Sequence, residues 1–264
     1  MESKKDKPLL GKKILITRSS EQASELCTKL ENLGAEIVHL PTIRILPPER
    51  YNGLDKAISE LNKYDWIIFT SSNGVDSFFT RLKQKGKDLD SLSNTKICAI
   101  GPATAQKIES YNLKVDLEPK QFTSEEIVKR FKPILSQQGK LRILLPRSDI
   151  APDLLPNELK KLGAEVKQVV AYRTVKERNM PRSIKQMLKN GQIDIITFTS
   201  SSTVKNFFYL IKKEELHPRI KFASIGPVTT KTVEQLDLKI EIQAREYTAE
   251  GLVKAILQNA DYHR

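Results

Sequence analysis

Short apolar runs alternate along the chain with longer stretches in which apolar residues recur every three or four positions. The first run, Ile14–Thr17, is short and contains β-branched residues, which is typical of a buried parallel strand. Ser19 and Gln22 then form a capping-box pattern, and apolar residues recur at helical spacing from Ala23 to Leu33. The same order predicts strands at 66–70, 97–100 and 115–117, followed by helices at 75–82, 103–111 and 127–135. This alternation predicts parallel sheets wrapped by helices.

The chain also repeats its own pattern. Three segments recur later in the chain at one constant spacing, namely Lys13–Ser20 as Arg142–Asp149, Leu33–Ile37 as Leu162–Val166, and Asp65–Ser72 as Asp194–Ser201. Two later pairs share a slightly shorter spacing, namely Ile100–Pro102 with Ile225–Pro227, and Thr123 with Thr248. A duplicated unit of about 125 residues is too long for a solenoid repeat and has the size of a domain.

Two extended segments, Leu40–Pro48 and Val169–Val175, interrupt the alternation at equivalent places in the two repeats. Prolines bracket the first segment, so it cannot continue into a helix or an interior strand. Both segments are predicted to cross between domains. One domain then comprises residues 1–38 and 176–264, the other comprises residues 42–170, and the linkers are residues 39–41 and 171–175.

The length of 264 residues agrees with two domains. No apolar run approaches the roughly 18 residues that a membrane span needs, so no membrane contact is expected. The charged start of the chain lacks the apolar segment of a signal peptide, which predicts a cytoplasmic protein. Residues 1–10 are expected to be a lead-in without fixed packing.

Cysteine and histidine do not indicate a metal site. Cys27 and Cys98 fall at apolar positions and are predicted to be small buried hydrophobic residues without a disulfide. The three histidines, His39, His217 and His263, have no acidic or thiol partner at ligand spacing. We therefore predict no metal.

Lysine and arginine give the chain a formal net charge of +12. Such a charge favours anionic partners, which include nucleic acid, acidic lipids and a polycarboxylate substrate, although a generally basic surface would have the same charge. The lysines are spread along the chain and no aromatic residues interleave with them, so no motif indicates nucleic acid.

Turns rich in hydroxyl groups and glycine follow the predicted strands. In open parallel sheets ligands bind at this carboxyl edge, where helix N-termini offer N–H groups to anionic oxygens. The alternative is that the serines and threonines only cap the helices that follow. The candidate binding residues are Arg18, Ser71, Ser72, Asn73, Gly101, Pro102, Thr104, Arg147, Ser148, Thr199, Ser200, Ser201, Gly226, Pro227 and Thr229.

No glycine-rich nucleotide motif follows a strand, and no Gly-x-Ser-x-Gly nucleophile turn is present. We therefore expect no cofactor. The chemistry is predicted to depend on holding an anionic substrate in one conformation rather than on covalent attack.

In order and spacing these motifs resemble the uroporphyrinogen-III synthase family from residue 12 to about residue 258. The first half carries Thr17-Arg18, Phe69-Thr70-Ser71-x-Asn73-Gly74-Val75 and Ile100-Gly101-Pro102-x-Thr104, and the second half carries Pro146-Arg147, Tyr172-Arg173-Thr174, Phe198-Thr199-Ser200-Ser201, Ile225-Gly226-Pro227-x-Thr229 and Thr248-x-x-Gly251-Leu252. The resemblance implies two flavodoxin-like α/β domains with parallel sheets, a two-stranded linker, and a substrate cleft between the domains.

The resemblance also implies a reaction. The substrate is hydroxymethylbilane, a linear tetrapyrrole with eight carboxylates. It loses its hydroxyl group, forms a spiro intermediate, inverts its last pyrrole ring and closes the macrocycle. Tyr172 matches the tyrosine in the family's linker and is the candidate to hydrogen-bond or protonate the departing hydroxyl; the alternative is an aromatic residue that only packs the linker. A monomer with a transient contact to the preceding pathway enzyme is expected.

Two other classes of function stay open at this stage. The first is a two-lobed α/β protein that binds or senses an anionic small molecule without catalysis. The missing signal peptide argues against a periplasmic receptor, and the missing helix-turn-helix argues against a repressor. The second class is a nucleic-acid-binding protein, which would need a concentrated Lys/Arg stripe that the sequence lacks.

Overall fold

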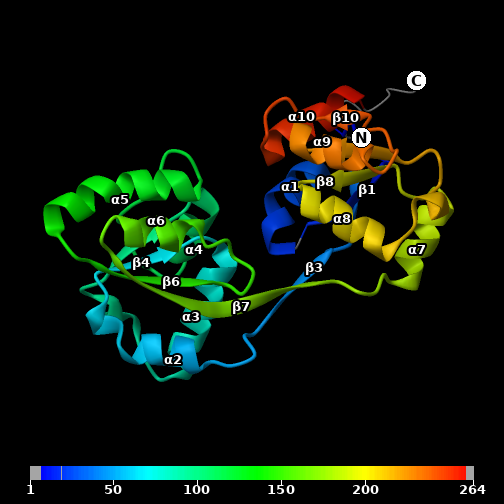
Figure 1. Ribbon diagram of the computed structural model, residues 1–264. Helices are drawn as coiled ribbons and strands as arrows, with labels where there is room; N and C mark the ends of the chain where they lie inside the picture. Colours follow the sequence, from blue (N-terminus) through cyan, green and yellow to red (C-terminus); the bar gives the residue numbers. More distant parts are fainter. Residues whose placement is uncertain (1–6, 19, 260–264) are drawn as a thin grey trace. The chain divides into compact units, whose positions relative to one another are not determined.

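The computed structural model describes residues 7–18 and 20–259 and divides into two compact units (Figure 1). The first unit takes the chain up to Arg44 and resumes at Val175, and the second unit runs from Ile45 to Thr174. Each unit has its own five-stranded sheet with helices around it.

The first unit has the strand order β10-β9-β8-β1-β2, and each of its strand pairs is parallel. Counted along the chain within the unit, this order is 2-1-3-4-5, which is the flavodoxin-like doubly wound order. Its elements are β1 (Lys13–Ile16), α1 (Ser20–Asn32), β2 (Glu36–His39), α7 (Arg182–Lys189), β8 (Ile195–Phe198), α8 (Ser201–Leu210), the 3-10 turn η3 (Lys213–Glu215), β9 (Lys221–Ser224), α9 (Pro227–Glu234), β10 (Ile242–Gln243) and α10 (Ala249–Asn259).

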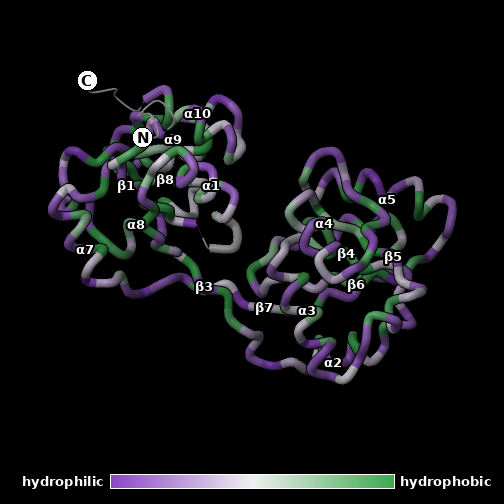
Figure 2. Tube along the Cα trace, turned by 180° about the vertical axis from the view of Figure 1, so that it is seen from behind, coloured by the Kyte–Doolittle hydropathy of each residue, from purple (hydrophilic) through white to green (hydrophobic). Residues whose placement is uncertain are grey.

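Alternate residues of each central strand in the first unit face opposite helical layers. Ile14 and Ile16 of β1 pack in the cluster formed with α1 and α10, whereas Leu15 packs in the cluster formed with α7, α8 and α9. Both faces of the sheet are therefore covered, which explains why its strands read as continuous apolar runs. Figure 2 shows the hydrophobic stretches inside each unit and the hydrophilic stretches on outer turns and helix faces.

The second unit has the strand order β3-β7-β6-β4-β5, and the pairs β4–β5, β4–β6 and β6–β7 are parallel. Ile67 and Phe69 of β4 pack against α2, α3 and α4, whereas Ile68 packs with α5 and α6. Its elements are α2 (Asn52–Ser59), η1 (Leu61–Lys63), β4 (Trp66–Phe69), α3 (Ser72–Gln84), η2 (Leu89–Leu92), β5 (Lys96–Ala99), α4 (Pro102–Glu109), α5 (Ser124–Gln138), β6 (Arg142–Ser148) and α6 (Leu154–Lys161).

Two neighbouring strands, β3 (Ile43–Leu46) and β7 (Glu165–Lys176), carry the chain across the boundary between the units. Within the first unit, Leu40 is buried in the α7–α9 cluster and the Glu177 carboxylate forms an ion pair with Arg44. Within the second unit, Tyr172 is buried in the cluster with α2, α3 and α4. The segments that break the sequence pattern therefore form extended strands.

Each sheet is built from both repeats. The first sheet joins β1 and β2 of the first repeat to β8, β9 and β10 of the second, and the second sheet joins β4 and β5 of the first repeat to β6 and β7 of the second. The bridge between Cys98 and Leu117 in the second unit is the counterpart, at the shorter repeat spacing, of the pairing of Ala223 with Ile242 in the first.

The structure confirms the α/β class with two parallel-dominated sheets. The strand predicted at 115–117 is reduced to the single bridge of Leu117. The prediction of a lead-in without packing is wrong for residues 7–10, because Leu9 is fully buried and its N–H donates to the Leu33 carbonyl at 2.9 Å. Residues 1–6 and the proposed Ser19–Gln22 capping box lie outside the described residues and side chains.

Candidate functional site

The turns that follow β1 and β8 lie side by side at the carboxyl edge of the first sheet. β1 pairs with β2 on one side and with β8 on the other, so the order of the strands reverses between β1 and β8. The buried Thr17 hydroxyl donates to the Thr197 carbonyl at 2.7 Å and ties the two strand ends together. Such a reversal point is where open α/β sheets bind ligands.

A cavity of about 210 Å³ occupies this reversal point in the first unit. Hydroxyl groups, one amide and one guanidinium dominate its lining, and Ile43 supplies the apolar part. Ser200 caps α8 by accepting from the Thr203 N–H at 3.2 Å, so the helix N-terminus is already ordered. The lining residues are Thr17, Arg18, Ile43, Thr199, Ser200, Ser202, Thr203 and Asn206.

Arg18 is the cationic side chain of this cavity. Burial lowers the pKa of its guanidinium, because removing a charge from water disfavours the charged form. A carboxylate in the cavity would offset that cost, since guanidinium pairs with carboxylate through charge-assisted hydrogen bonds. The cavity therefore suits a carboxylate.

Tyr172 is the counterpart, in the second unit, of Ile43 in the first. The spacing between these two residues equals the spacing between Arg18 and Arg147. The side chain is 7% exposed, and its hydroxyl lies 2.9 Å from Ser71 Oγ. Ser71 also caps α3 by accepting from the Gly74 N–H at 3.1 Å. Burial raises the pKa of Tyr172, while the Ser71 hydrogen bond and the positive charge of Arg147 act in the opposite direction. The phenol therefore stays protonated at neutral pH and can donate its proton.

Gly74 makes room for this arrangement. A Cβ atom at residue 74 would lie 3.1 Å from the Pro146 carbonyl oxygen, 3.3 Å from Ser71 Oγ and 3.8 Å from Tyr172 Cε1. The equivalent residue in the first unit is Thr203, whose hydroxyl instead donates to the Ser200 carbonyl at 2.7 Å. A glycine at 74 therefore accompanies the tyrosine at 172.

Arg147 at the end of β6 is the cation of the second edge. It is 4% exposed, and its Nη1 donates to Gln168 Oε1 at 3.1 Å. Its Nε atom is buried without a hydrogen-bond partner among the described residues. Burial lowers the pKa of Arg147. Next to it, Ser148 Oγ lies 2.9 Å from Thr174 Oγ1 and donates to Asp149 at 3.0 Å.

A second pair of turns opens α4 and α9. Pro102 and Pro227 occupy the first helical turn, and Gly101 and Gly226 are the N-caps. Thr104 and Thr229 in the first turns are buried. The hydroxyls of Ser72 and Ser201 donate to the Ala103 and Val228 carbonyls at 3.2 and 3.3 Å, so they tie each of these turns to the preceding helix.

An exposed aromatic ring covers each of these glycines. A Cβ at residue 101 would lie 2.9 Å from the Phe122 ring, and a Cβ at residue 226 would lie 2.9 Å from the Tyr247 ring. Phe122 is 57% exposed and Tyr247 is 65% exposed. The two rings are separated by the same spacing as the two glycines, so the pair could have been found from the repeat, yet neither ring was among the candidate residues.

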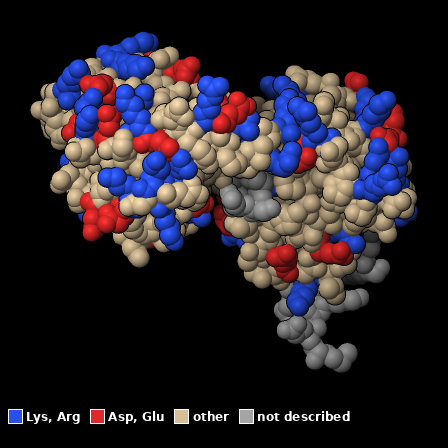
Figure 3. Space-filling model, turned by 90° about the horizontal axis from the view of Figure 1, so that it is seen from below, with Lys and Arg blue, Asp and Glu red and all other residues tan. Residues whose placement is uncertain are grey.

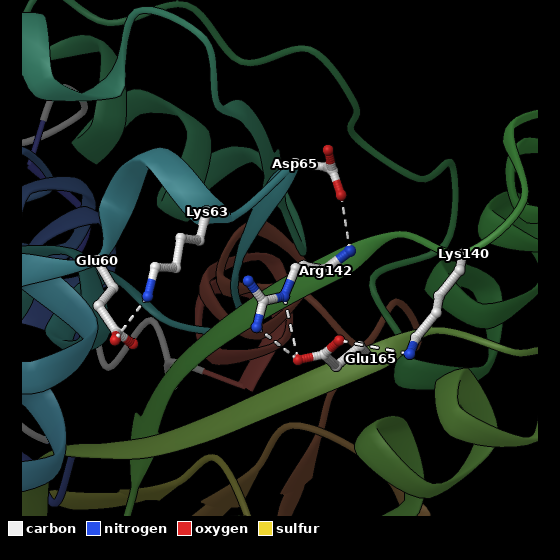
Figure 4. A network of polar contacts seen from close by, with 6 residues as sticks. All are labelled: Glu60, Lys63, Asp65, Lys140, Arg142 and Glu165. Carbon is white, nitrogen blue, oxygen red and sulfur yellow. Dashed lines mark hydrogen bonds and ion pairs between the residues drawn. The ribbon is translucent and has the colours of Figure 1, made fainter.

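Ion pairs and hydrogen bonds hold the amino edge of the second sheet together (Figure 4). Arg142 donates through Nε and Nη2 to Glu165 at 3.0 and 2.8 Å, and the Asp65 carboxylate accepts from the Arg142 backbone N–H at 2.7 Å. Lys140 lies 3.6 Å from the other oxygen of Glu165, and the neighbouring Lys63 and Glu60 pair at 2.9 Å. These charges compensate each other, so they are structural.

The structure groups the candidate residues by unit. Arg18, Thr199 and Ser200 line one cavity, and Ser71 contacts Tyr172. Asn73 is buried in the first turn of α3. The candidate residues did not include Thr17, Ile43, Ser202, Thr203 and Asn206 of the cavity, nor Gln168 beside Arg147. The repeat spacing would have pointed to Ile43 as the counterpart of Tyr172.

Positive charge is distributed over both units. On the face shown in Figure 3, Lys and Arg side chains occur in separate groups with Asp and Glu between them. The net charge of +12 therefore provides a general field for anions.

The prediction for the histidines is wrong at one position. His39 Nε2 lies 3.6 Å from Cys27 Sγ, because helix α1 packs this thiol against β2. Both cysteines are buried and free, as predicted, and His263 lies outside the described residues. Within residues 7–18 and 20–259, no group of three or more metal-ligating side chains occurs, and none of the helices is long and apolar enough to cross a membrane.

A family model, curated relatives and a solved structure all match this chain to one family. A family model described as uroporphyrinogen-III synthase HemD matches residues 24–254. A uroporphyrinogen-III synthase of Synechococcus elongatus is 34% identical over 261 residues, which cover 96% of this chain and 97% of that protein. One of Chlorobaculum parvum is 29% identical, with 94% and 98% covered. The crystal structure of uroporphyrinogen-III synthetase from Helicobacter pylori shares the fold, with a TM-score of 0.64 at 20% identity, and 94% of this chain and 99% of that chain are covered.

Proposed function

Since the chain belongs to the uroporphyrinogen-III synthase family, we propose that the carboxyl edges of its two sheets perform different parts of that family's reaction. The enzyme cyclises hydroxymethylbilane to uroporphyrinogen III with inversion of the last pyrrole ring. The family match covers most of the chain, so a two-lobed binding or regulatory protein without catalysis is not favoured.

The first edge is proposed to bind carboxylates of the substrate. The cavity of about 210 Å³ supports this role, because it combines the Arg18 guanidinium with the hydroxyls of Thr199 and Ser200. Ser201, Gly226 and Thr229 of the same unit are proposed as further donors, and Pro227, which has no N–H, is proposed to shape the turn at the start of α9. A substrate with eight carboxylates also suits a chain with a net charge of +12.

The second edge is proposed to supply the acid. The observation that carries this proposal is the buried Tyr172 hydroxyl held 2.9 Å from Ser71 Oγ. Loss of the substrate hydroxyl as water requires a proton, and a phenol with a raised pKa is protonated when the substrate arrives. Ser72, Asn73, Gly101, Pro102, Thr104 and Ser148 are proposed to position other substrate groups at this edge.

These roles need no cofactor or metal, because proton transfer and positioning account for each step that the residues perform. We propose that the enzyme acts in the cytoplasm as a monomer. We also propose a transient contact with the preceding pathway enzyme, since free hydroxymethylbilane closes by itself to isomer I.

The test uses freshly made hydroxymethylbilane, with the uroporphyrin isomers separated after oxidation. The wild-type protein is expected to form isomer III, whereas the blank gives isomer I. Exhaustive dialysis against EDTA should leave the initial rate unchanged. Isomer I alone in the presence of the folded protein would contradict the function, and a rate restored only by added metal would contradict the cofactor-free mechanism.

A further inference from the structure

Phe122 and Tyr247 are exposed aromatic residues at matching places in the two units. The spacing between them equals the spacing between Gly101 and Gly226, the N-cap glycines of α4 and α9. More than half of each aromatic side chain is exposed, and neither belongs to the core clusters around α5 and α10. Because apolar groups stabilise a fold in proportion to the area they remove from water, such rings contribute little to folding. Their recurrence in both units therefore indicates a role other than core packing.

A tight backbone turn holds each ring in place. In the second unit, the N–H of Thr123 donates to the Gln121 carbonyl at 2.9 Å across the phenylalanine. In the first unit, the N–H of Thr248 donates to the Glu246 carbonyl at 2.8 Å across the tyrosine. The same two threonines then cap α5 and α10 through their hydroxyls. Main-chain hydrogen bonds therefore set the position of the ring in the same way in both units.

The glycine beneath each ring is explained by the ring and not by the backbone. Gly101 has φ −178° and Gly226 has φ 170°, which is extended backbone that any residue adopts. A Cβ atom at either position, however, would lie 2.9 Å from ring carbon atoms of Phe122 or Tyr247. A contact this short forces a neighbour to move, so a larger residue would push the ring off the turn. Glycine thus lets an open ring rest against the start of α4 or α9.

A cation accompanies each ring. Lys120 and Arg245 come two residues before Phe122 and Tyr247, so they also match at the repeat spacing. Both are exposed, and within residues 7–18 and 20–259 neither forms an ion pair with a carboxylate. Each loop therefore offers a ring for stacking and a positive charge for an anion.

We propose that Phe122 and Tyr247 are stacking platforms, each for one pyrrole ring of hydroxymethylbilane, and that Lys120 and Arg245 bind carboxylates of the stacked rings. The proposal rests on the proposed function and adds binding residues to it. A pyrrole is a flat, electron-rich ring, and in this substrate it carries carboxylates, so it matches both parts of the loop. The two loops follow the bridge at Leu117 and the strand β10, which places them at the carboxyl edge where open α/β sheets bind ligands.

The alternative is that each ring only fixes the start of the following helix. A hydrophobic residue just before an N-cap can pack against the fourth helical residue. Those residues are Ile127 and Leu252, which are fully buried in the core clusters, whereas the rings are open. A leucine in place of either ring would serve such a contact equally well, so leucine variants separate the two roles.

The first test compares Phe122→Leu and Tyr247→Leu with the wild-type enzyme in isomer III formation. Each change keeps an apolar side chain and removes the ring, so KM should rise about 2- to 10-fold with kcat nearly constant. Phe122→Tyr and Tyr247→Phe keep the ring and should keep KM. Tyr209→Leu, at a tyrosine of α8 that is 66% exposed, is the matched control and should change neither constant.

The other parts of each loop have their own variants. Gly101→Ala and Gly226→Ala should raise KM in the same way, because the new methyl group displaces the ring while the extended backbone accepts alanine. Lys120→Gln and Arg245→Gln should raise KM at low ionic strength and by less at high ionic strength, because salt screens exposed charges.

A fluorescence readout separates stacking from a structural role. The chain has a single tryptophan, Trp66, which is buried, so Phe122→Trp adds an exposed indole at the platform. Anaerobic addition of uroporphyrinogen III, whose pyrrole rings are not conjugated with each other, should quench or shift the emission of this indole, measured as the difference from the wild type. Tyr209→Trp is the control and should show no change in emission.

The outcomes separate the inference from the function on which it rests. Isomer III formed by the wild type together with an unchanged KM in both leucine variants would overturn the platforms and leave the function standing. A lower thermal unfolding midpoint with unchanged KM in those variants would assign the rings to the helix starts instead. An emission of Phe122→Trp that ignores the product would also overturn the platform at that ring. A wild-type protein that forms no isomer III would overturn both.

Discussion

Ile43 and Tyr172 occupy equivalent positions in the two units, and they make two related carboxyl edges chemically different. In the first unit, Ile43 leaves a cavity of about 210 Å³ in front of Ser200. In the second unit, Tyr172 fills that place and its hydroxyl reaches Ser71, the counterpart of Ser200. Two units of the same fold thus carry an open polar cavity at one edge and a buried phenol at the other.

The amino edges of the two sheets have not diverged in this way. In the first unit, Asp194 accepts from the Lys13 backbone N–H at 2.7 Å and the Lys13 ammonium pairs with Glu36 at 2.9 Å. In the second unit, Asp65, Arg142 and Glu165 repeat that arrangement. The two units are therefore alike where charges hold the strands together and differ at the edge that carries the helix N-termini.

Tyr172→Phe should have the largest effect on the rate of isomer III formation. It removes the proposed acid, so the second edge, like the first, has no hydroxyl at this position. We expect isomer III formation to slow by roughly 10²–10⁴-fold, the usual contribution of a general acid. Tyr209→Phe, at an exposed tyrosine of α8, is the matched control and should leave the initial rate unchanged. A well-folded Tyr172→Phe enzyme with full turnover would remove the tyrosine from the mechanism.

The reverse change would make the first edge resemble the second. In Ile43→Tyr with Thr203→Gly, the new ring should fill the cavity beside Arg18 and displace a substrate carboxylate. We expect KM to rise about tenfold, which is the loss of one hydrogen bond to a charged group, with a smaller effect on kcat. Thr203→Gly alone controls for the lost capping of α8. If KM stays constant in the double variant, the cavity does not bind substrate.

Gly74→Ala should have an intermediate effect on stability and rate. The added methyl group would crowd Ser71 and Tyr172 without removing either side chain. The added methyl group would be 3.1 Å from the Pro146 carbonyl, so we expect a loss of about 1–3 kcal/mol in the free energy of unfolding and a fall of kcat of roughly tenfold. Gly53→Ala in α2 meets no atom closer than 4.0 Å and should not destabilise the protein. Equal unfolding midpoints in urea for both variants would show that the site can relax around residue 74.

Ser71→Ala and Ser200→Ala should have the smallest effects on stability and rate, and they compare two equivalent helix caps directly. Each removes a helix N-cap and should cost about 1 kcal/mol of unfolding free energy. Only Ser71→Ala also releases the Tyr172 hydroxyl, so only this variant should lower kcat, by a few-fold. Thermal unfolding and initial rates measured on both proteins check this, and an equal effect on kcat would mean that the hydrogen bond to Tyr172 is not used.

The sequence predicted the frame because its signals are local. The apolar run at Ile14–Thr17, the helical spacing from Ala23 to Leu33 and the constant spacing of the repeated segments each follow from short segments of the chain. The turns at the carboxyl edge could be predicted for the same reason. The exception was the start of the chain, where Leu9 packs into the core although charged residues surround it.

The pairing of side chains could not be predicted, because it depends on contacts distant in sequence. Ser71 and Tyr172 are 101 residues apart, and their contact requires the order β7-β6-β4 together with the irregular register after Arg147. The contact of Arg147 with Gln168 is equally invisible in the sequence, because it joins β6 to β7. The rings over Gly101 and Gly226 were missed because an isolated aromatic before a helix gives no binding signal.

The insertion of the second unit between Arg44 and Val175 has a consequence during synthesis on the ribosome. β1 lies between β2 and β8, so it keeps one open edge until the strand at Ile195–Phe198 has emerged. The whole second unit, from Ile45 to Thr174, emerges first and, as an uninterrupted unit, can fold while the earlier segment waits. At about 5–20 residues per second, the apolar β1–α1–β2 segment stays unpartnered for roughly 10 to 30 seconds, an interval in which nascent-chain chaperones have an exposed strand edge to protect.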